Sequence, residues 1–151
     1  ILDGIKQVIG AENVIFAGNN HQRDGADTVI VVVGEKPYAE GFGDEPAEGL
    51  ALTQRDLHLI EKYKDVGARV ITIVISGRPL VVNEELKLSD AFVAAWLPGS
   101  EGKGIAEVLF GDYNFKGKLG FSWPRSADQI PIHVGDENYD PLFPYGFGLT
   151  Y

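Results

Sequence analysis

One segment that is unusually dense in carboxylates directly follows an apolar run. Residues 34–45 read Gly-Glu-Lys-Pro-Tyr-Ala-Glu-Gly-Phe-Gly-Asp-Glu. A carboxyl group there can act as a general acid if burial or a neighbouring negative charge raises its pKa, which reactions that expel an alkoxide require. A solvated acidic loop and a cation site are the two simpler interpretations. The oxygen ligands available to a cation do not have the calcium-loop spacing; they are Glu35, Glu40, Asp44, Glu45 and Glu48.

Other chemistries have less support in the sequence. There is no cysteine, so thiol nucleophiles and cysteine metal sites are excluded, and the compartment stays undetermined. The histidines His21, His58 and His133 are scattered, without metal-ligand spacing. Residues 98–104 resemble a phosphate loop but lack its defining positions, and no dinucleotide fingerprint follows an apolar run. A doubly wound nucleotide-binding domain is therefore disfavoured.

Composition narrows the class of protein. A chain of 151 residues suits one compact domain. The formal net charge of -9 repels phosphate backbones, so nucleic acid is not an expected partner. Apolar runs are strand-sized and shorter than the roughly 18 residues of a membrane span, so we expect no membrane span.

Short apolar runs alternate with helical patterns along the chain. Residues 28–33 form a β-branched run without polar alternation, as expected for a strand covered on both faces. Residues 69–75 repeat this pattern, and residues 91–95 are a weaker case. Residues 14–16 and 119–123 are further short strand candidates. This alternation predicts an α/β fold, a mostly parallel sheet with helices on both faces.

The helices that position the acidic segment have recognisable ends. Thr53 and Asp56 form a capping box for a helix that reaches about Val66, and Gly67 stands where a C-terminal cap belongs. Ser100 is a candidate cap for a short helix that stops at Gly111. We expect residues 1–123 to form the α/β sandwich. Residues 124–151, rich in Pro, Gly and aromatics, are expected to be an irregular tail packed on it.

The first residues have the pattern of a helix interior. Leu2, Ile5, Val8 and Ile9 form an apolar stripe with no capping residue before it, and no signal peptide is visible. The sequence is therefore interpreted as a piece of a longer protein.

Several motifs, in order, resemble the second domain of glycoside hydrolase family 3, in its branch of β-glucan exohydrolases and β-glucosidases. The resemblance runs from the first strand to the last residue and is weak over residues 1–27. Its motifs are Gly-Glu-x-Pro-Tyr-x-Glu at 34–40, Gly-Asp at 43–44, Ile-Ser-Gly-Arg-Pro at 75–79, Ala-Ala-Trp-Leu-Pro-Gly-Ser-Glu-Gly at 94–102, Leu-Phe-Gly-Asp at 109–112, Gly-Lys-Leu at 117–119 and Pro-Leu-Phe-Pro-Tyr-Gly-Phe-Gly-Leu-Thr-Tyr at 141–151.

The resemblance implies one half of a retaining glycosidase site. It makes Glu40 the general acid/base and places the aspartate nucleophile in an N-terminal (β/α)8 barrel that this chain lacks. Asp44 and Glu45 are possible supporting residues, which could raise the pKa of Glu40 by like charge or order its loop. The implied substrate is a β-glucan or β-glucoside, hydrolysed exo-fashion with no metal and no other cofactor. A secreted or periplasmic location is implied in the same way.

Two further expectations accompany the resemblance. Arg78 is expected to anchor the domain through a forked hydrogen-bond pattern rather than touch sugar. For Trp96, core packing or a domain contact is favoured over sugar stacking. The alternative function is a stand-alone, non-catalytic carbohydrate-binding or interaction module. In that case Glu40 only accepts hydrogen bonds from sugar, and no barrel domain accompanies the chain.

Overall fold

The computed structural model describes residues 1–18, 25–38 and 43–151. Its elements follow in the order α1 (Leu2–Ile9), β1 (Thr28–Gly34), α2 (Gln54–Asp65), β2 (Arg69–Ile75), α3 (Asn83–Leu88), β3 (Ala91–Trp96) and α4 (Gly102–Leu109), with 3-10 turns η1 (Ala11–Asn13), η4 (Ala47–Gly49) and η5 (Ala127–Gln129).

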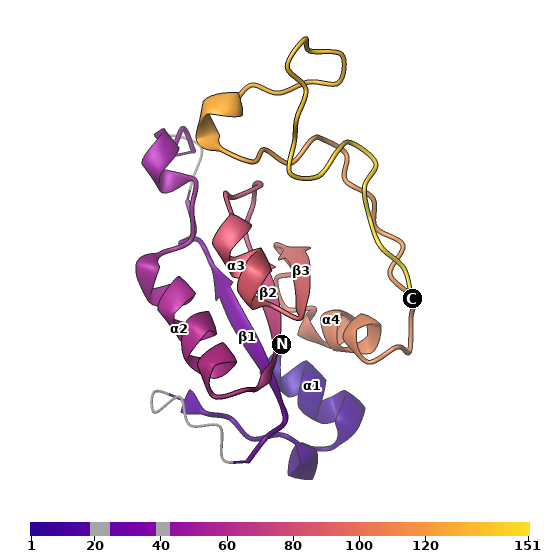
Figure 1. The fold of residues 1–151 in the computed structure, drawn as a ribbon. Coiled ribbons are helices and arrows are strands. Elements are labelled where there is room, and N and C mark those ends of the chain that lie inside the picture. The colour runs from indigo at the N-terminus through magenta and orange to yellow at the C-terminus, as the bar shows by residue number, and fades with distance from the viewer. Residues whose placement is uncertain (19–24, 39–42) are drawn as a thin grey trace.

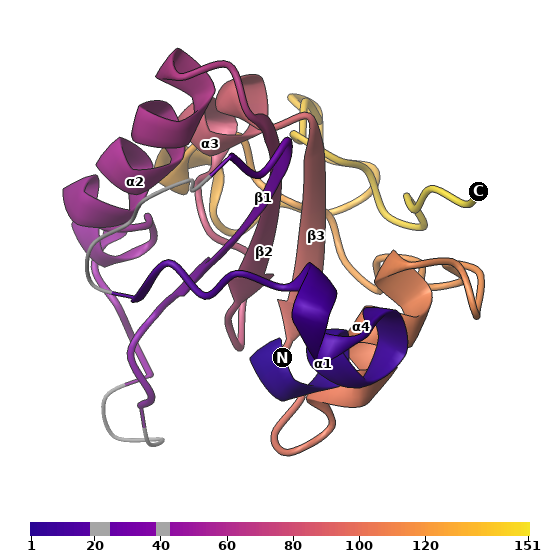
Figure 2. The same ribbon diagram turned by 90° about the horizontal axis from the view of Figure 1, so that it is seen from below.

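Within the described residues the strands form one parallel three-stranded sheet in the order β1-β2-β3. Val31 pairs with Thr72, and Ile73 pairs with Val93. Helices α2 and α3 cover one face of the sheet, and α1 and α4 lie on the other (Figures 1 and 2). The predicted α/β class, with helices on both faces of a parallel sheet, is therefore confirmed.

The central strand β2 contributes several fully buried side chains to the core. Val70, Ile73 and Val74 of β2 are fully buried, as a strand covered on both faces must be. Helix α2 contributes Ile60 and Tyr63 to this core. On the other face α1 lies against α4, and Gly4 permits this approach, because a Cβ there would collide with the backbone of Gly102.

Helix α2 begins as its sequence predicts. The Thr53 hydroxyl accepts from the Asp56 backbone N–H at 3.2 Å, and the Asp56 carboxylate accepts from the Thr53 N–H at 3.2 Å. Gly67 follows the helix in a left-handed conformation with φ of 72°. The capping box is therefore confirmed. Val66, the expected end of the helix, directly follows Asp65, the last residue of α2, and is 54% exposed.

Four local expectations were wrong. Residues 14–16, which are described, form no strand, because they have no ladder partner, and Ile15 and Phe16 are largely exposed. Strand β1 is not covered on both faces, since Val32 is 44% exposed.

The Ser100 hydroxyl bonds to Glu101 instead of capping α4. Residues 119–123 form only an isolated antiparallel bridge, from Trp123 to Phe143. Helix α3 was not predicted from the sequence.

The last stretch of chain is an irregular trace (Figure 1). Its contact with the sheet domain centres on Trp123, whose indole N–H donates to the Leu80 carbonyl at 2.7 Å. Phe143 lies edge-on to Trp123 and stacks on Phe147 with 4.6 Å between ring centroids. Tyr145 remains exposed. No helix of the described residues is long and apolar enough to span a bilayer.

Helix α3 carries a buried carboxyl group, Glu85, which is 6% exposed. Burial raises the pKa of Glu85 above its usual 4.5, with smaller contributions from the negative charges of Glu84 and Asp56. The folded state therefore holds the proton more tightly than the unfolded state. Stability falls as the pH rises from the unfolded pKa through the higher folded pKa.

We expect Glu85→Gln to remove this pH dependence. The neutral amide resembles the protonated acid, so the variant should differ little from the parent near pH ~4 and have the higher Tm near pH ~7. Thermal unfolding at both pH values measures the difference. The exposed Glu48→Gln serves as the control and should show no such trend. If the Tm of the parent increased relative to that of the variant as the pH rises, the prediction would be contradicted.

Candidate functional site at the carboxyl edge of the sheet

The carboxyl ends of β1 and β2 lie side by side, because Gly34 pairs with Ile75 in the parallel register. The acidic segment leaves β1 at this edge, and the Ser76-Gly77-Arg78 turn leaves β2 there. Ligands of open α/β sheets bind beyond the carboxyl ends of the strands. A ligand site is therefore expected at this edge.

Glu35 joins the two segments across the edge. Its Oε1 accepts a hydrogen bond from the Gly77 backbone N–H at 2.9 Å, and its Oε2 lies 3.1 Å from Nε of Arg78. The Glu35 side chain is 14% exposed and that of Arg78 is 16% exposed. A carboxylate and a guanidinium this buried must neutralise one another, since either charge alone would be costly there.

Arg78 also contacts the acidic segment further along. Its Nη1 donates to the Gly43 carbonyl at 2.5 Å, and its Cζ lies 3.8 Å from the centroid of the Tyr38 ring. Nε is close to the Glu35 carboxylate but poorly aligned for a hydrogen bond, and Nη2 has no hydrogen-bond partner in the described part of the chain. Arg78 thus contacts both segments, as an anchor would, but among the described residues it does not form the forked hydrogen-bond pattern expected of it.

The candidate acid/base Glu40 lies outside the described residues. The supporting candidates Asp44 and Glu45 are described, and both are exposed. The Glu45 carboxylate folds back over η4, where a Cβ added at Gly49 would collide with it. This position of Glu45 favours an ordering role in its own turn over a role as a charged neighbour.

Trp96 ends β3 at the same edge with φ of 53°, at an irregularity where Ile75 pairs with Trp96. Its ring is half-buried and lies edge-on to Phe121, with centroids 5.5 Å apart, and 5.7 Å from Trp123. The aromatic neighbours of Trp96 therefore belong to the packing between the sheet and the C-terminal tail, as its favoured interpretation predicts.

The described residues do not form a cluster suited to a metal ion. Across 1–18, 25–38 and 43–151, no group of three or more His, Asp or Glu side chains is arranged to hold an ion. His58 lies on α2, 4.0 Å from Glu61, and is well exposed.

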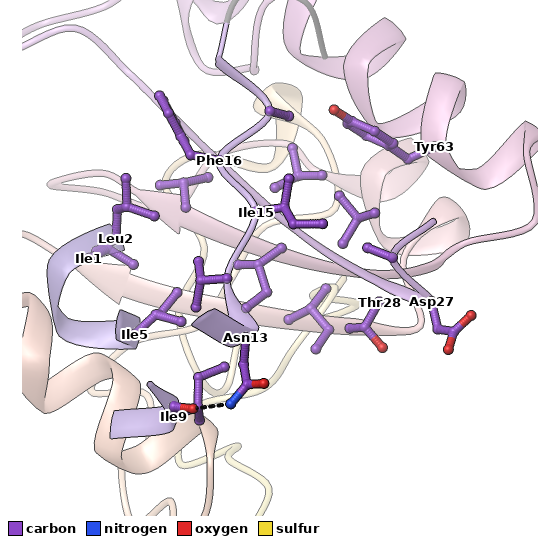
Figure 3. Close-up of a pocket in the computed structure, with 18 of the residues that line it drawn as sticks. Ile1, Leu2, Ile5, Ile9, Asn13, Ile15, Phe16, Asp27, Thr28 and Tyr63 are labelled. Carbon is purple, nitrogen blue, oxygen red and sulfur yellow. Dashed lines mark hydrogen bonds between the residues drawn. The ribbon is translucent and has the colours of Figure 1, made fainter. Parts of the chain in front are cut away.

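A hollow in the described surface lies away from this edge. It has a volume of about 660 Å³ and is lined by α1, residues 13–18 and β1 (Figure 3). Ile1, Leu2, Ile5, Ile15 and Phe16 surround it, and the Asn13 side chain donates to the Ile9 carbonyl beside it. Such an apolar lining offers few partners for sugar hydroxyls, and neither Glu35 nor Arg78 takes part. It is not part of the candidate site.

Sequence reasoning did not foresee the Glu35–Arg78 pair or the stacking of Tyr38 on Arg78. The members of the pair are separated by 43 positions in the chain, and no local pattern links them. The only available signal was topological. Both residues follow buried strands, so strands adjacent in a parallel sheet would bring them together.

The fold and this edge define a class: a small α/β sandwich that presents a loop rich in carboxylates beyond adjacent parallel strands. The match to a known family is specific. Residues 1–151 match the model of the glycosyl hydrolase family 3 C-terminal domain, and the chain belongs to that family.

Several relatives and solved structures that resemble this chain are glycoside hydrolases. A periplasmic beta-glucosidase of Salmonella typhimurium is 35% identical over 83% of this chain and 19% of its own length. A beta-xylosidase of Formosa agariphila is 31% identical over 100% of this chain and 25% of its own. The crystal structure of an exo-1,3/1,4-beta-glucanase from a Pseudoalteromonas species is 52% identical, with a TM-score of 0.76, over 82% of this chain and 16% of that one.

The chain thus spans about a fifth of the length of the curated relatives it matches. A beta-glucosidase structure from Listeria innocua agrees in this respect, with 28% identity, a TM-score of 0.71, and coverage of 85% of this chain and 21% of that one.

Proposed function

We propose that this chain is the acid/base half of a retaining, exo-acting β-glucosidase or β-glucan glucohydrolase. Glu40 is the general acid/base, and the nucleophile comes from a (β/α)8 barrel that precedes the chain in the complete protein. The observation that carries the proposal is the 52% identity to the exo-1,3/1,4-beta-glucanase over most of the chain.

The site at the sheet edge supports this role. Tyr38 and Gly43 flank the Glu40 segment, and both contact Arg78 at the carboxyl edge of the sheet. An acid on one domain and a nucleophile on another meet in the cleft between the domains, where ligand pockets commonly lie. Retaining enzymes hold the two carboxyls about 5–5.5 Å apart, on opposite sides of the scissile bond.

In the proposed mechanism, Glu40 protonates the glycosidic oxygen while the barrel's carboxylate attacks the anomeric carbon. The leaving sugar departs as a neutral alcohol. Glu40, now ionised, then removes a proton from the water that hydrolyses the glycosyl-enzyme. Glu45 has a supporting role, in which its contact with η4 orders the acidic segment. Asp44 contributes a negative charge to the same segment, which favours the protonated form of Glu40.

The proposed substrate and location are taken from the names of the relatives. The glucanase and beta-glucosidase names favour β-linked glucose over xylose, and the Salmonella relative's name favours a periplasmic or secreted protein.

Complementation tests this division of the site. We expect the isolated chain not to hydrolyse an aryl β-glucoside, because a general acid without its nucleophile contributes little alone. Adding the separately purified barrel domain of the complete protein should restore hydrolysis.

The matched controls are Glu40→Gln, which should abolish the rescue, and Glu48→Gln, an exposed carboxylate of the next turn, which should leave it intact. Turnover by the isolated chain that depends on Glu40 would mean that the second carboxylate lies within these residues. Sugar binding by the chain, with rescue indifferent to Glu40, would favour the carbohydrate-binding module instead.

A further inference from the structure

Both flanks of the segment that carries Glu40 meet at one side chain. Tyr38 precedes this segment, and its ring lies against the Arg78 guanidinium with 3.8 Å from Cζ to the centroid. Gly43 follows the segment, and its carbonyl accepts from Nη1 of Arg78. Tyr38 and Gly43, which are five positions apart in the sequence, therefore both contact Arg78.

Arg78 is itself held in place by the sheet. Its backbone carbonyl accepts a hydrogen bond at 2.7 Å from the Ser76 hydroxyl, and Ser76 is 2% exposed. Glu35, which directly follows β1, fixes the guanidinium through Nε and fixes the turn through Gly77. The planar, always charged guanidinium is suited to contact a carboxylate, a carbonyl and an aromatic face together, which a lysine ammonium is not.

The Tyr38 contact has a second support in Gly77. A Cβ at Gly77 would lie 2.5 Å from the Tyr38 hydroxyl oxygen and 3.5 Å from Cδ1 of Leu97. Glycine at this position therefore leaves the room that the Tyr38 ring occupies over the turn. The Glu35, Tyr38, Gly43, Gly77 and Arg78 contacts form one unit, which we call the Arg78 clamp.

We propose that Arg78 is a positioning residue, which sets the placement of the Glu40 carboxyl by clamping both flanks of its segment to the carboxyl edge of the sheet. This inference rests on the proposed acid/base role of Glu40. Arg78 acts through the loop and need not touch the substrate. Its effect should therefore be confined to the steps that need Glu40.

A positioning role can be distinguished from a purely structural role by comparing two substrates whose leaving groups differ in their need for protonation. A disaccharide of β-linked glucose needs protonation of its leaving oxygen, whereas a dinitrophenyl β-glucoside expels a stable phenolate without it. Loss of folded enzyme lowers kcat/KM for both substrates by the same factor. The ratio of the two values, measured on one preparation, cancels that loss.

The experiment uses the complete protein with Arg78→Met. We expect kcat/KM for the disaccharide to fall roughly 10- to 100-fold, as for a displaced catalytic group, and that for the dinitrophenyl glucoside to fall less than about threefold. Gly77→Ala, which keeps the charges, should reproduce the selective loss. In a Glu40→Gln background Arg78→Met should add little, because both changes remove the same step.

Arg125→Met is the matched control. Arg125 also bonds through its guanidinium to a carboxylate and a carbonyl, those of Asp140 at 3.4 Å and Pro141 at 3.1 Å, but in the C-terminal tail. It should change the ratio of the two kcat/KM values by less than about twofold.

Each outcome decides. If Glu40→Gln is selective for the disaccharide while Arg78→Met lowers both substrates equally, the clamp is structural only and the inference is overturned, although the proposed function stands. If Glu40→Gln shows no selectivity, the proposed function fails and the inference fails with it. A selective loss in both Arg78→Met and Gly77→Ala, absent in Arg125→Met, supports the clamp.

Discussion

Replacing Glu40 with Gln in the complete enzyme is expected to lower kcat/KM for a β-linked disaccharide of glucose by about 10²- to 10⁴-fold. The amide cannot protonate the glycosidic oxygen, so an alkoxide would have to leave unassisted. For a dinitrophenyl β-glucoside the first step needs no acid, and kcat/KM should change little. Steady-state kinetics with both substrates measures the contrast.

The same variant should also change the rate-limiting step. Without its base, hydrolysis of the glycosyl-enzyme slows, so a burst of dinitrophenolate should precede a slow steady state. Glu48→Gln is the control for a carboxylate lost from the same region of the chain, and it should retain parent kinetics. An equal loss for both substrates in Glu40→Gln would contradict the acid/base assignment.

The largest stability effect is expected at Trp123, which is 2% exposed. Trp123→Ala removes a buried ring that contacts Trp96 and Phe143, as well as the hydrogen bond to the Leu80 carbonyl. We expect the free energy of unfolding to fall by about 3–5 kcal/mol, as for other large-to-small changes at buried aromatic positions. Chemical denaturation of the isolated chain measures it.

Two control variants separate the causes of this loss. Trp123→Phe keeps most of the ring but not the indole donor, so it should lose only part of the stability and leave the Leu80 carbonyl without its partner. Tyr145→Ala removes an aromatic ring of the tail that is 62% exposed and should have an effect within about 0.5 kcal/mol. Equal effects of Trp123→Ala and Tyr145→Ala would show that Trp123 does not join the tail to the core.

The elements that local patterns define were predictable from the sequence. The β-branched runs of residues 28–33 and 69–75 became β1 and β2, because β-branched side chains favour strands. The Thr53–Asp56 capping box fixed the start of α2, because its hydrogen bonds connect neighbouring residues. These features need no knowledge of the rest of the fold.

Features that depend on a distant partner were not predictable in the same way. Residues 14–16 have strand-like composition, but no strand in the described part of the chain pairs with them. Helix α3 is short, and its burial of Glu85 is a matter of packing rather than of periodicity. The exposed Val32 of β1 has a residue type typical of the interior, so its exposure could not be read from its neighbours.

The candidate site divides along the same line. The family resemblance identified Glu40 as the Glu of Pro-Tyr-x-Glu, because the motifs of the family can be recognised in order along the sequence. The clamp around it joins Glu35 to Arg78, and their contact exists only because β1 and β2 are adjacent and parallel. Local spacing carries no information on that pairing, so the role of Arg78 became specific only with the structure.

The acid/base role of Glu40 is tested most directly by the product that Glu40→Ala forms in the presence of azide. Azide is a nucleophile that needs no general base, so it should react with the glycosyl-enzyme that water cannot hydrolyse. With dinitrophenyl β-glucoside, we expect azide to speed turnover by Glu40→Ala and to give β-glucosyl azide, identified by its anomeric proton in NMR, with no such product from Glu48→Ala. The α-glucosyl azide would place the nucleophile rather than the acid/base at residue 40, and no azide product at all would remove Glu40 from the reaction.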